Sequence, residues 1–542
     1  MEFFSGDNIG LYIAIALSVA NGILMCFASY KFFQIIQLSG YRIKGYFRWL
    51  KDTKANYVSR MALLSLLSIF CVLVTNALFD AYHTETLYSY IGLIFYFYFT
   101  IVFIVNLYHA PKKTPLKYTT RMTRLNVAMF IFVTLFSFFI IAISTEYISL
   151  LKFGALCIVP LFIPLIVPLV HIILLPLESI VINSHVARAK RKLKKCPNLI
   201  KIGITGSFGK TSTKYILNTI LSQKFKVCMS PHSFNTLPGL SKVVNNYLNL
   251  DDEILIAEMG ARNVGDIKKL CNLINPKYGV ITGVGSQHLQ YFKTQENILK
   301  TKFELIESLP RDNGLAIFNG YDEGAKKLYD RCTFVEKRIV GKYSSITAKN
   351  VLYDENGTTF NLIINDKDYK TKTSLIGEHN VENIVLCVQM AKELGLTDNQ
   401  IIAGIESLKP IPHRLELIRT DNNLILDDAY NASVDGSVVA LNVLSKMPGR
   451  KVVITPGLIE LGKKGEEENK NLGKRIAKVA DIVVIVNKLN FNAIKLGLDE
   501  ENFGDDNVYQ ADSLDSAKIL MNDFLKPGDS ILFENDLPDN YI

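Results

Sequence analysis

The sequence lacks the features of a zinc protein, a repeat protein or a disordered chain. Its eight cysteines are too widely spaced to form the close pairs that a structural zinc site requires, and no internal repeat is found. Hydrophobic residues make up 49% of the 542 residues and charged residues 20%, which is too apolar for disorder or a low-complexity tail. We therefore expect folded domains.

What the chain does have is a concentration of apolar residues near its N-terminus. A helix of about 20 apolar residues crosses a hydrocarbon core of about 30 Å. Five runs of 19–23 residues meet this requirement with almost no charge: Ile9–Ser29, Met61–Phe79, Leu87–Leu107, Leu125–Ile143 and Phe153–Leu175. A signal peptide explains at most the first run, which lacks a basic start and a small-residue cleavage site. We predict a membrane domain over residues 1–176 with about five transmembrane helices.

Among the segments that join these runs, strongly basic segments alternate with segments that carry no net positive charge. Three basic segments together carry a formal charge of +17: Lys31–Arg60, Lys112–Arg124 and Arg188–Lys195. Because the net charge of the whole chain is +9, the rest of the chain carries −8. The positive-inside rule then places the N-terminus outside and everything after about residue 176 in the cytoplasm. This predicts a multi-pass protein of the plasma membrane. The charge marks orientation and suits a lipid bilayer partner, and it gives no support to nucleic-acid binding.

The rest of the chain has the pattern of an α/β protein. After a basic linker helix over 177–195, short apolar runs alternate with longer amphipathic stretches, as in βαβ units with a parallel sheet. The runs are Leu199–Ile204, Ile254–Ala257, Gly279–Thr282, Leu315–Phe318, Leu424–Leu426, Val452–Thr455, Ile482–Val486 and Ile531–Phe533. Pro410 and Pro412 mark a boundary between domains at 196–411 and 412–542. Residues 349–372 predict a β-hairpin that turns at Asn356-Gly357. We expect the cytoplasmic cysteines to be reduced packing residues.

The most specific motif is a phosphate-binding loop. Thr205-Gly206-Ser207-Phe208-Gly209-Lys210-Thr211-Ser212 follows a predicted strand and precedes a helix predicted over Lys210–Leu221. Backbone N–H groups in such a loop, with the helix N-terminus, bind the phosphates of a nucleotide. Lys210 would neutralise the outer phosphates, and the Thr211 hydroxyl would bind Mg²⁺. The general pattern has glycine where this chain has Ile204, so the loop is the variant Thr-Gly-x-x-Gly-Lys-Thr.

This variant resembles the ATP loop of the Mur ligase family, enzymes that add amino acids to peptidoglycan precursors. The resemblance continues over about 345 residues, in the segments Ser233–Thr236, Glu258–Ala261, Thr282–Gly285 with His288, Thr301–Glu304, Gly377–Asn383, Arg414 and Asp427–Ala432. The run Asp-Asp-x-Tyr-Asn-Ala, with Thr455-Pro456-Gly457 and Glu460-Leu461-Gly462, is most similar to the D-alanyl-D-alanine-adding, UDP-N-acetylmuramoyl-tripeptide ligase branch. The resemblance implies a central P-loop ATPase domain and a Rossmann-like C-terminal domain.

The resemblance also implies site residues. The catalytic set is Lys210, Lys302, His288 and Glu258, and the metal set is Thr211, Glu258, His288 and, if it is carbamylated, Lys302. The residues of the phosphate loop that would bind ATP are Gly206, Ser207, Phe208, Gly209, Lys210, Thr211 and Ser212. Further ATP contacts would be Asn380, Asn383, Arg414 and Asp428. The substrate contacts are Ser233, Asn235, Thr236, Tyr430 and Asn431. Phosphorylation by ATP would convert a carboxylate into an acyl phosphate that an amine attacks, releasing ADP and phosphate.

Two departures from the family pattern affect the substrates. The membrane segment stands where soluble members carry a domain that binds the uridine nucleotide, so we hypothesise a lipid-linked or membrane-proximal acceptor. The family branch usually ends in a Lys-Gly-Ser-Arg strand near the amino substrate, whereas this chain has Phe533-Glu534-Asn535-Asp536. These acids favour an amine with extra positive charge, or they belong to a solvated tail.

Three functions compete. The first is a membrane-anchored amide ligase that joins a cell-wall precursor to an amino acid or dipeptide. The second is a poly-γ-glutamate-type capsule ligase, which resembles the same family. The third is an ATP-driven transporter, which is disfavoured because the spans lack polar stripes. Isolated polar residues in the spans, such as Asn21, are more often contacts between helices than a transport path.

Overall fold

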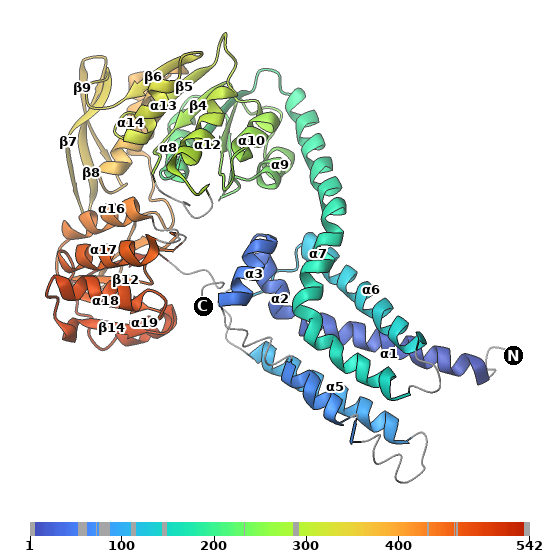
Figure 1. Cartoon of the computed structure of the whole chain (residues 1–542). Coiled ribbons are helices and arrows are strands. Elements are labelled where there is room, and N and C mark those ends of the chain that lie inside the picture. Colours follow the sequence, from blue (N-terminus) through green and yellow to red (C-terminus); the bar gives the residue numbers. More distant parts are fainter. Residues whose placement is uncertain are drawn as a thin grey trace. The chain divides into compact units, whose positions relative to one another are not determined.

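The computed structural model describes residues 6–52, 62–71, 73–74, 87–109, 115–143, 149–231, 233–285, 292–430, 433–459, 461 and 464–535 (Figure 1). The chain divides into two compact units at residue 181. The first unit is helical, and the second contains three β-sheets with their covering helices.

The helical unit contains α1 (Gly6–Ala28), α2 (Tyr30–Leu38), α3 (Ile43–Asp52), α5 (Leu87–His109), α6 (Thr120–Ile143) and most of α7 (Ser149–Lys194). Three described stretches are long and apolar enough to cross a membrane: Leu11–Ala28, Thr120–Ala142 and Leu156–Lys194. The two other expected spans, 61–79 and 87–107, include residues whose backbone or side chains are not described. The three stretches indicate membrane anchoring.

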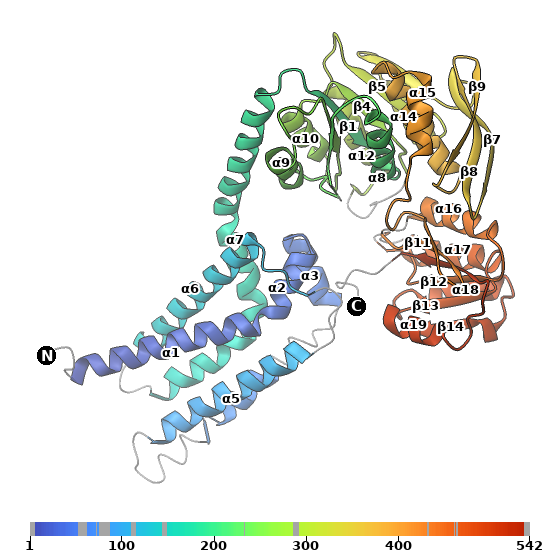
Figure 2. The same cartoon turned by 180° about the vertical axis from the view of Figure 1, so that it is seen from behind.

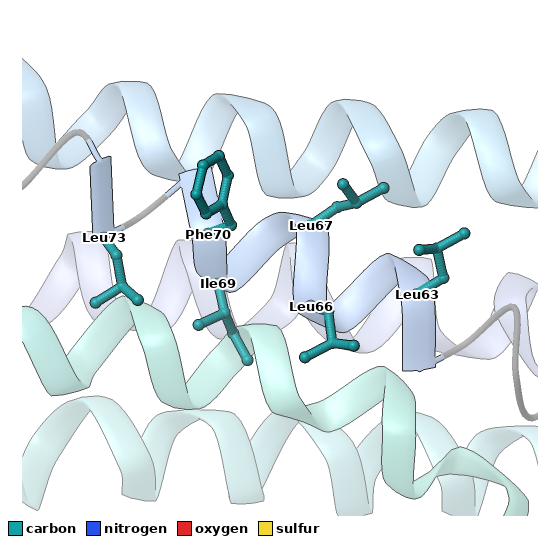
Figure 3. A pocket seen from close by; sticks show the side chains of 6 residues that line it. All are labelled: Leu63, Leu66, Leu67, Ile69, Phe70 and Leu73. Atoms are coloured by element: carbon teal, nitrogen blue, oxygen red, sulfur yellow. The ribbon is translucent and has the colours of Figure 1, made fainter.

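Apolar side chains face outward on this unit. Leu135, Phe139 and Ile180 are each more than 60% exposed. A shallow apolar groove is lined from one helical segment by Leu63, Leu66, Leu67, Ile69, Phe70 and Leu73 (Figure 3). Such surfaces are typical of helices that contact lipid hydrocarbon.

Buried polar contacts join the apolar helices. The Asn21 side chain donates to Ser137 Oγ at 2.9 Å and accepts from the Tyr96 hydroxyl at 2.7 Å. Glu178 of α7 accepts two hydrogen bonds from Arg124 of α6, at 2.7 and 2.9 Å. Asn21 thus makes the helix–helix contact that its isolation in the sequence suggested.

Helix α7 is continuous over 46 residues, although it contains Pro160, Pro164, Pro168 and Pro176 (Figure 2). The expected linker helix is therefore the end of the same helix as the fifth apolar run. Near this end, Lys192 Nζ donates to the carbonyl oxygen of Asn245 at 3.1 Å, and the Asn245 amide donates to that of His185 at 3.1 Å.

The middle sheet has six parallel strands in the order β2-β3-β1-β4-β5-β6. They are β1 (Ile200–Thr205), β2 (Val227–Met229), β3 (Ile254–Glu258), β4 (Tyr278–Ile281), β5 (Leu315–Asn319) and β6 (Glu336–Val340). One face packs on α8 (Lys210–Leu221), α14 (Glu378–Glu393) and α15 (Asp398–Glu406). The other packs on α9 (Leu237–Asn246), α10 (Asp266–Ile274), α12 (Gln295–Glu307) and α13 (Glu323–Arg331). Strand order reverses at β1, and ligands bind at the carboxyl ends of strands at such points.

A small antiparallel sheet follows, with β7 (Ile346–Asp354), β8 (Gly357–Ile364) and β9 (Lys367–Thr373). The predicted hairpin is confirmed, but Asp354 pairs with Gly357, so the turn is Glu355-Asn356, one residue earlier than expected. A second turn at Asn365-Asp366, both with positive φ, adds a third strand that was not predicted.

The C-terminal sheet has the order β10-β11-β15-β12-β13-β14 and is parallel except for β10. The strands are β10 (Glu416–Arg419), β11 (Leu424–Asp428), β12 (Lys451–Thr455), β13 (Ile482–Val486), β14 (Val508–Ala511) and β15 (Ser530–Glu534). Helices α16 (Val434–Ser445), α17 (Gly465–Ala477) and α18 (Phe491–Glu500) cover one face, and α19 (Leu514–Met521) covers the other. The last strand, β15, lies between β11 and β12.

All eight cysteines are free, and the five that follow residue 181 are buried. They pack within the α/β unit, as the wide spacing in the sequence predicted.

Candidate functional site

The phosphate loop lies at the carboxyl end of β1, where the middle sheet reverses its strand order. Gly209 precedes α8 with φ +78°, a conformation that favours glycine. The Ser207 N–H donates to the carbonyl oxygen of Gly283 at 2.6 Å. A Cβ atom on Gly206 would lie 2.0 Å from Thr282 Oγ1, so a side chain is excluded there. The backbone of the loop is thus held directly against the residues that follow β4, with no side chain of Gly206 between them.

Lys210, the first residue of α8, faces back into the loop. Its Nζ donates to the carbonyl oxygens of Gly206 at 2.7 Å and Ser207 at 2.6 Å. Burial lowers the pKa of the Lys210 ammonium to about 8; Glu258 opposes this shift and Arg414 adds to it. A phosphate bound here would offer the ammonium a stronger partner than two carbonyl oxygens.

A buried carboxylate ends the neighbouring strand β3. Glu258 is 1% exposed, and Lys214 Nζ lies 3.1 Å from its Oε2. Thr211 Oγ1 donates to the same oxygen at 3.2 Å, while the Asn235 amide donates to Oε1 at 3.0 Å. The structure therefore brings three of the expected residues, Thr211, Asn235 and Glu258, to one point.

Lys214 belongs to this cluster but was not predicted from the sequence. Its side chain is fully buried, and burial lowers its pKa despite the adjacent Glu258. It lies four residues after Lys210 on the same helix, and residues so spaced share one helix face. That spacing was the available signal.

Lys302 lies in α12 and is 3% exposed. Burial, and then the positive charge of Lys210, hold its pKa well below the usual value. Lys302 is therefore within electrostatic reach of the phosphate loop. The expected metal ligand His288 falls outside the described residues.

Two expected residues of the C-terminal domain meet the middle domain. The Arg414 guanidinium lies over the Tyr430 ring, 4.3 Å from its centroid. The Tyr430 hydroxyl makes a hydrogen bond with Ser233 Oγ. Since the charge of Arg414 also lowers the pKa of Lys210, Arg414 lies within electrostatic reach of the phosphate loop. Asn431 falls outside the described residues.

The remaining expected contacts have local partners. Asn383 Oδ1 accepts from Thr213 Oγ1 at 3.1 Å and lies beside Gly209, so it is at the phosphate loop. The Asn380 amide instead donates to the carbonyl oxygen of Ile376 at 2.9 Å. Thr236 caps α9 by accepting from the Gly239 N–H. Phe208 bridges to Gly283, and Ser212 is partly buried in α8.

A pair of carboxyl groups lies at the carboxyl ends of two neighbouring strands in the C-terminal sheet. Asp428 of β11 pairs in register with Glu534 of β15. Glu534 is 1% exposed, so it is a buried strand residue and not part of a solvated tail. Neither of its oxygens has a hydrogen-bond partner among the described residues. Burial, and then Asp428, hold the pKa of Glu534 well above its usual value, and burial raises that of Asp428 to about 6.

Two family models match the α/β unit. The Mur ligase middle domain matches residues 204–391, and the Mur ligase glutamate ligase domain matches residues 413–534. The MurF ligase from Thermotoga maritima, solved in complex with ADP, is 29% identical and covers 66% of this chain and 80% of its own, with a TM-score of 0.58. MurF from Acinetobacter baumannii, at 22% identity and a TM-score of 0.60, shares the fold.

Curated relatives agree. The UDP-N-acetylmuramoyl-tripeptide–D-alanyl-D-alanine ligase of Bacillus subtilis is 31% identical over 279 residues, which are 51% of this chain and 60% of that protein. The Mycobacterium tuberculosis enzyme of the same name is 30% identical over 357 residues, covering 61% of this chain and 69% of its own length. The chain spans about 60% of the length of the Bacillus subtilis and Escherichia coli relatives. Both matched domains, the shared fold and the relatives lead to one conclusion: the chain belongs to the Mur ligase family.

Proposed function

We propose that this protein is a membrane-anchored, ATP-dependent amide ligase that acts on a cell-wall precursor. The observation that carries the proposal is the convergence of Lys210, Thr211 and Glu258 at the carboxyl ends of β1 and β3 in a Mur ligase fold. ATP would phosphorylate an acceptor carboxylate, and an amine would displace phosphate from the acyl phosphate to form the amide. Positioning and charge neutralisation dominate such transfers.

The donor set at Glu258 fits Mg²⁺, which prefers oxygen ligands. Thr211 supplies a hydroxyl and Glu258 a buried carboxylate that already carries cationic and amide partners. We assign Thr211, Glu258 and His288 to the metal, whose role would be to neutralise phosphate charge. Lys210 would bind the outer phosphates, and the backbone of Gly206–Gly209 would hold the chain of phosphates in place.

Lys302 would join this set as a carbamate. An unprotonated lysine amine combines with CO₂ to give a carbamate and a proton. Burial and the nearby Lys210 both favour the unprotonated amine of Lys302, which supports the assignment. The product would be an anionic oxygen ligand where an ammonium would repel a metal.

The acceptor and the membrane topology belong to the same proposal. We assign residues 1–176 to a plasma-membrane domain with the N-terminus outside, 177–195 to a linker, and 196–411 and 412–542 to cytoplasmic catalytic domains. The acceptor would be a lipid-linked or membrane-proximal precursor, because apolar helices precede the middle domain here. The three long apolar stretches support the anchoring.

The test is ADP release by the full chain reconstituted in lipid nanodiscs. Lipid-linked and UDP-linked muramoyl peptides are crossed with amino acids and dipeptides. Release that needs both a carboxylate acceptor and an amine supports the ligase, and equal use of UDP-linked and lipid-linked acceptors contradicts the lipid-linked assignment. A polymeric product would identify the poly-γ-glutamate alternative. Release stimulated by a transported solute alone would contradict the proposal.

A further inference from the structure

The carboxyl ends of three neighbouring strands meet in the C-terminal sheet. β11 ends at Asp428, β15 at Glu534 and β12 at Thr455. The chain reaches β15 last but inserts it between the first two parallel strands, so strand order reverses here. Such reversals form the crevices in which open α/β sheets bind ligands.

The pair Asp428 and Glu534 faces the side of the sheet that α16 covers. Residues paired in register on parallel strands point to the same face, and Leu426 and Leu532, two positions earlier, pack in the core with α16. Asp428 Oδ1 accepts from the Leu415 N–H at 3.2 Å. Among the described residues, neither oxygen of the Glu534 carboxyl group has a hydrogen-bond partner. Buried carboxylates normally have such partners.

The charge of one residue, Arg414, acts on both this pair of acids and the phosphate loop. The Arg414 guanidinium lowers the pKa of both Lys210 and Asp428. A substrate could therefore place its reacting amine near the phosphate loop and a second group near the acids. An ammonium group offers three donors, which match the two Glu534 oxygens and one Asp428 oxygen.

We propose that Asp428 and Glu534 bind a second cationic group of the amine substrate, so that the ligase adds a basic amino acid. This inference rests on the proposed function. It gives Asp428 a role in amine recognition in place of the ATP contact expected from the sequence. A hard metal ion is a poorer occupant, because Ca²⁺ or Mg²⁺ takes six or more oxygen ligands.

The test compares lysine with norleucine, which has the same straight side chain without the ammonium. The full chain in nanodiscs receives ATP and either UDP-N-acetylmuramoyl-tripeptide or the polyprenyl-diphosphate-linked tripeptide. Hydroxylamine first traps any acyl phosphate as a hydroxamate, which reports phosphorylation separately from amine choice. Both enantiomers of each amino acid are then used, and KM and kcat are measured for each.

We expect the KM for lysine to be at least about tenfold lower than that for norleucine, the effect of one charged hydrogen-bonded pair. Glu534→Gln should raise the KM for lysine about tenfold and change that for norleucine less. Glu534→Lys should instead favour glutamate over lysine. The matched control Asp515→Asn removes one negative charge from exposed α19 and should leave both KM values unchanged.

Each outcome decides between the two proposals. Hydroxamate formation with equal use of lysine and norleucine would overturn this inference and leave the ligase intact. No hydroxamate with any acceptor would overturn both. Dependence on K⁺, with no discrimination between the amino acids, would assign the acids to a metal ion and overturn the inference. If a Glu534 variant fails to fold, the lysine-to-norleucine ratio of the unaltered protein still decides.

Discussion

The α/β unit ends two of its strands in buried glutamates, and the two have opposite surroundings. Glu258 at the end of β3 is surrounded by Lys214, Thr211 and Asn235. Glu534 at the end of β15 has only another acid, Asp428, as its paired neighbour. Glu258 thus has an ammonium, a hydroxyl and an amide as partners, whereas burial and the neighbouring Asp428 hold the pKa of Glu534 well above its usual value. Two equally buried carboxylates therefore differ in their partners, and this difference is the basis for proposing a metal and phosphate site at the first and a cation site at the second.

The largest expected effect is at the first site. Lys210→Ala should lower ADP release by about 1000-fold, because an ammonium aimed at the transferring phosphate is lost. The measurement is acceptor-dependent ADP release by the full chain in nanodiscs. Lys327→Ala, an exposed lysine of α13, is the control and should retain activity. Unchanged release in Lys210→Ala would remove the phosphate-loop assignment.

The next test breaks the pairing of Glu258. Lys214→Met leaves a buried carboxylate without its ammonium partner, which should lower the free energy of unfolding by about 3 kcal/mol. Hydrogen exchange of β3 and α8 peptides measures the loss, since Trp49, the only tryptophan, lies in the helical unit. Adding Glu258→Gln should recover much of it.

The control for this prediction is Lys226→Met. Lys226 pairs with Asp251 on the surface, where both side chains are about two-thirds exposed, so the change should cost much less free energy of unfolding than Lys214→Met. Equal losses in Lys214→Met and Lys226→Met would contradict the importance of the buried pair.

A third change tests whether the first site gains an anion from Lys302. Lys302→Ala should lower activity about 10- to 100-fold, and added acetate or formate should restore part of it by supplying the missing carboxylate. ADP release with and without the carboxylates is the readout. Lys300→Ala, an exposed neighbour on α12, should neither lose activity nor respond. A loss without rescue would indicate a role other than carbamate formation.

The strands that the sequence analysis did not predict show why the other strands could be predicted. Every short apolar run predicted after residue 195 became a strand. The strands of the two large sheets that were missed are β2, β6, β10 and β14, and these four are the outer strands. Inner parallel strands are buried on both faces and read as continuous apolar runs. Outer strands such as Glu336–Val340 have exposed positions, so their charged residues hide the pattern.

The two glutamate sites differ in predictability for a related reason. Glu258, Thr211 and Lys210 lie in motifs that resemble those of the Mur ligase family, so the resemblance predicted their meeting. The pairing of Asp428 with Glu534 joins residues 106 positions apart and depends on β15 inserting between β11 and β12. Sequence spacing carries no information about that insertion, which is why the acids after Phe533 could equally be a tail.

The smallest expected effect is a pH dependence confined to the second site. Folding raises the pKa of Asp428 to about 6 and that of Glu534 further above its ordinary value, so the folded state binds more protons than the unfolded chain. Stability that is complete below about pH 4 is therefore lost as pH rises through the folded pKa values. Hydrogen-exchange protection of β11 and β15, corrected for the intrinsic pH dependence of exchange, should fall at least about tenfold between pH 5 and pH 8, the equivalent of one pKa unit. Glu534→Gln should remove most of this fall, whereas Asp515→Asn, which removes an exposed carboxylate of α19, should leave the fall unchanged. A fall of unchanged size in Glu534→Gln would mean that the buried acids of the second site do not cause it.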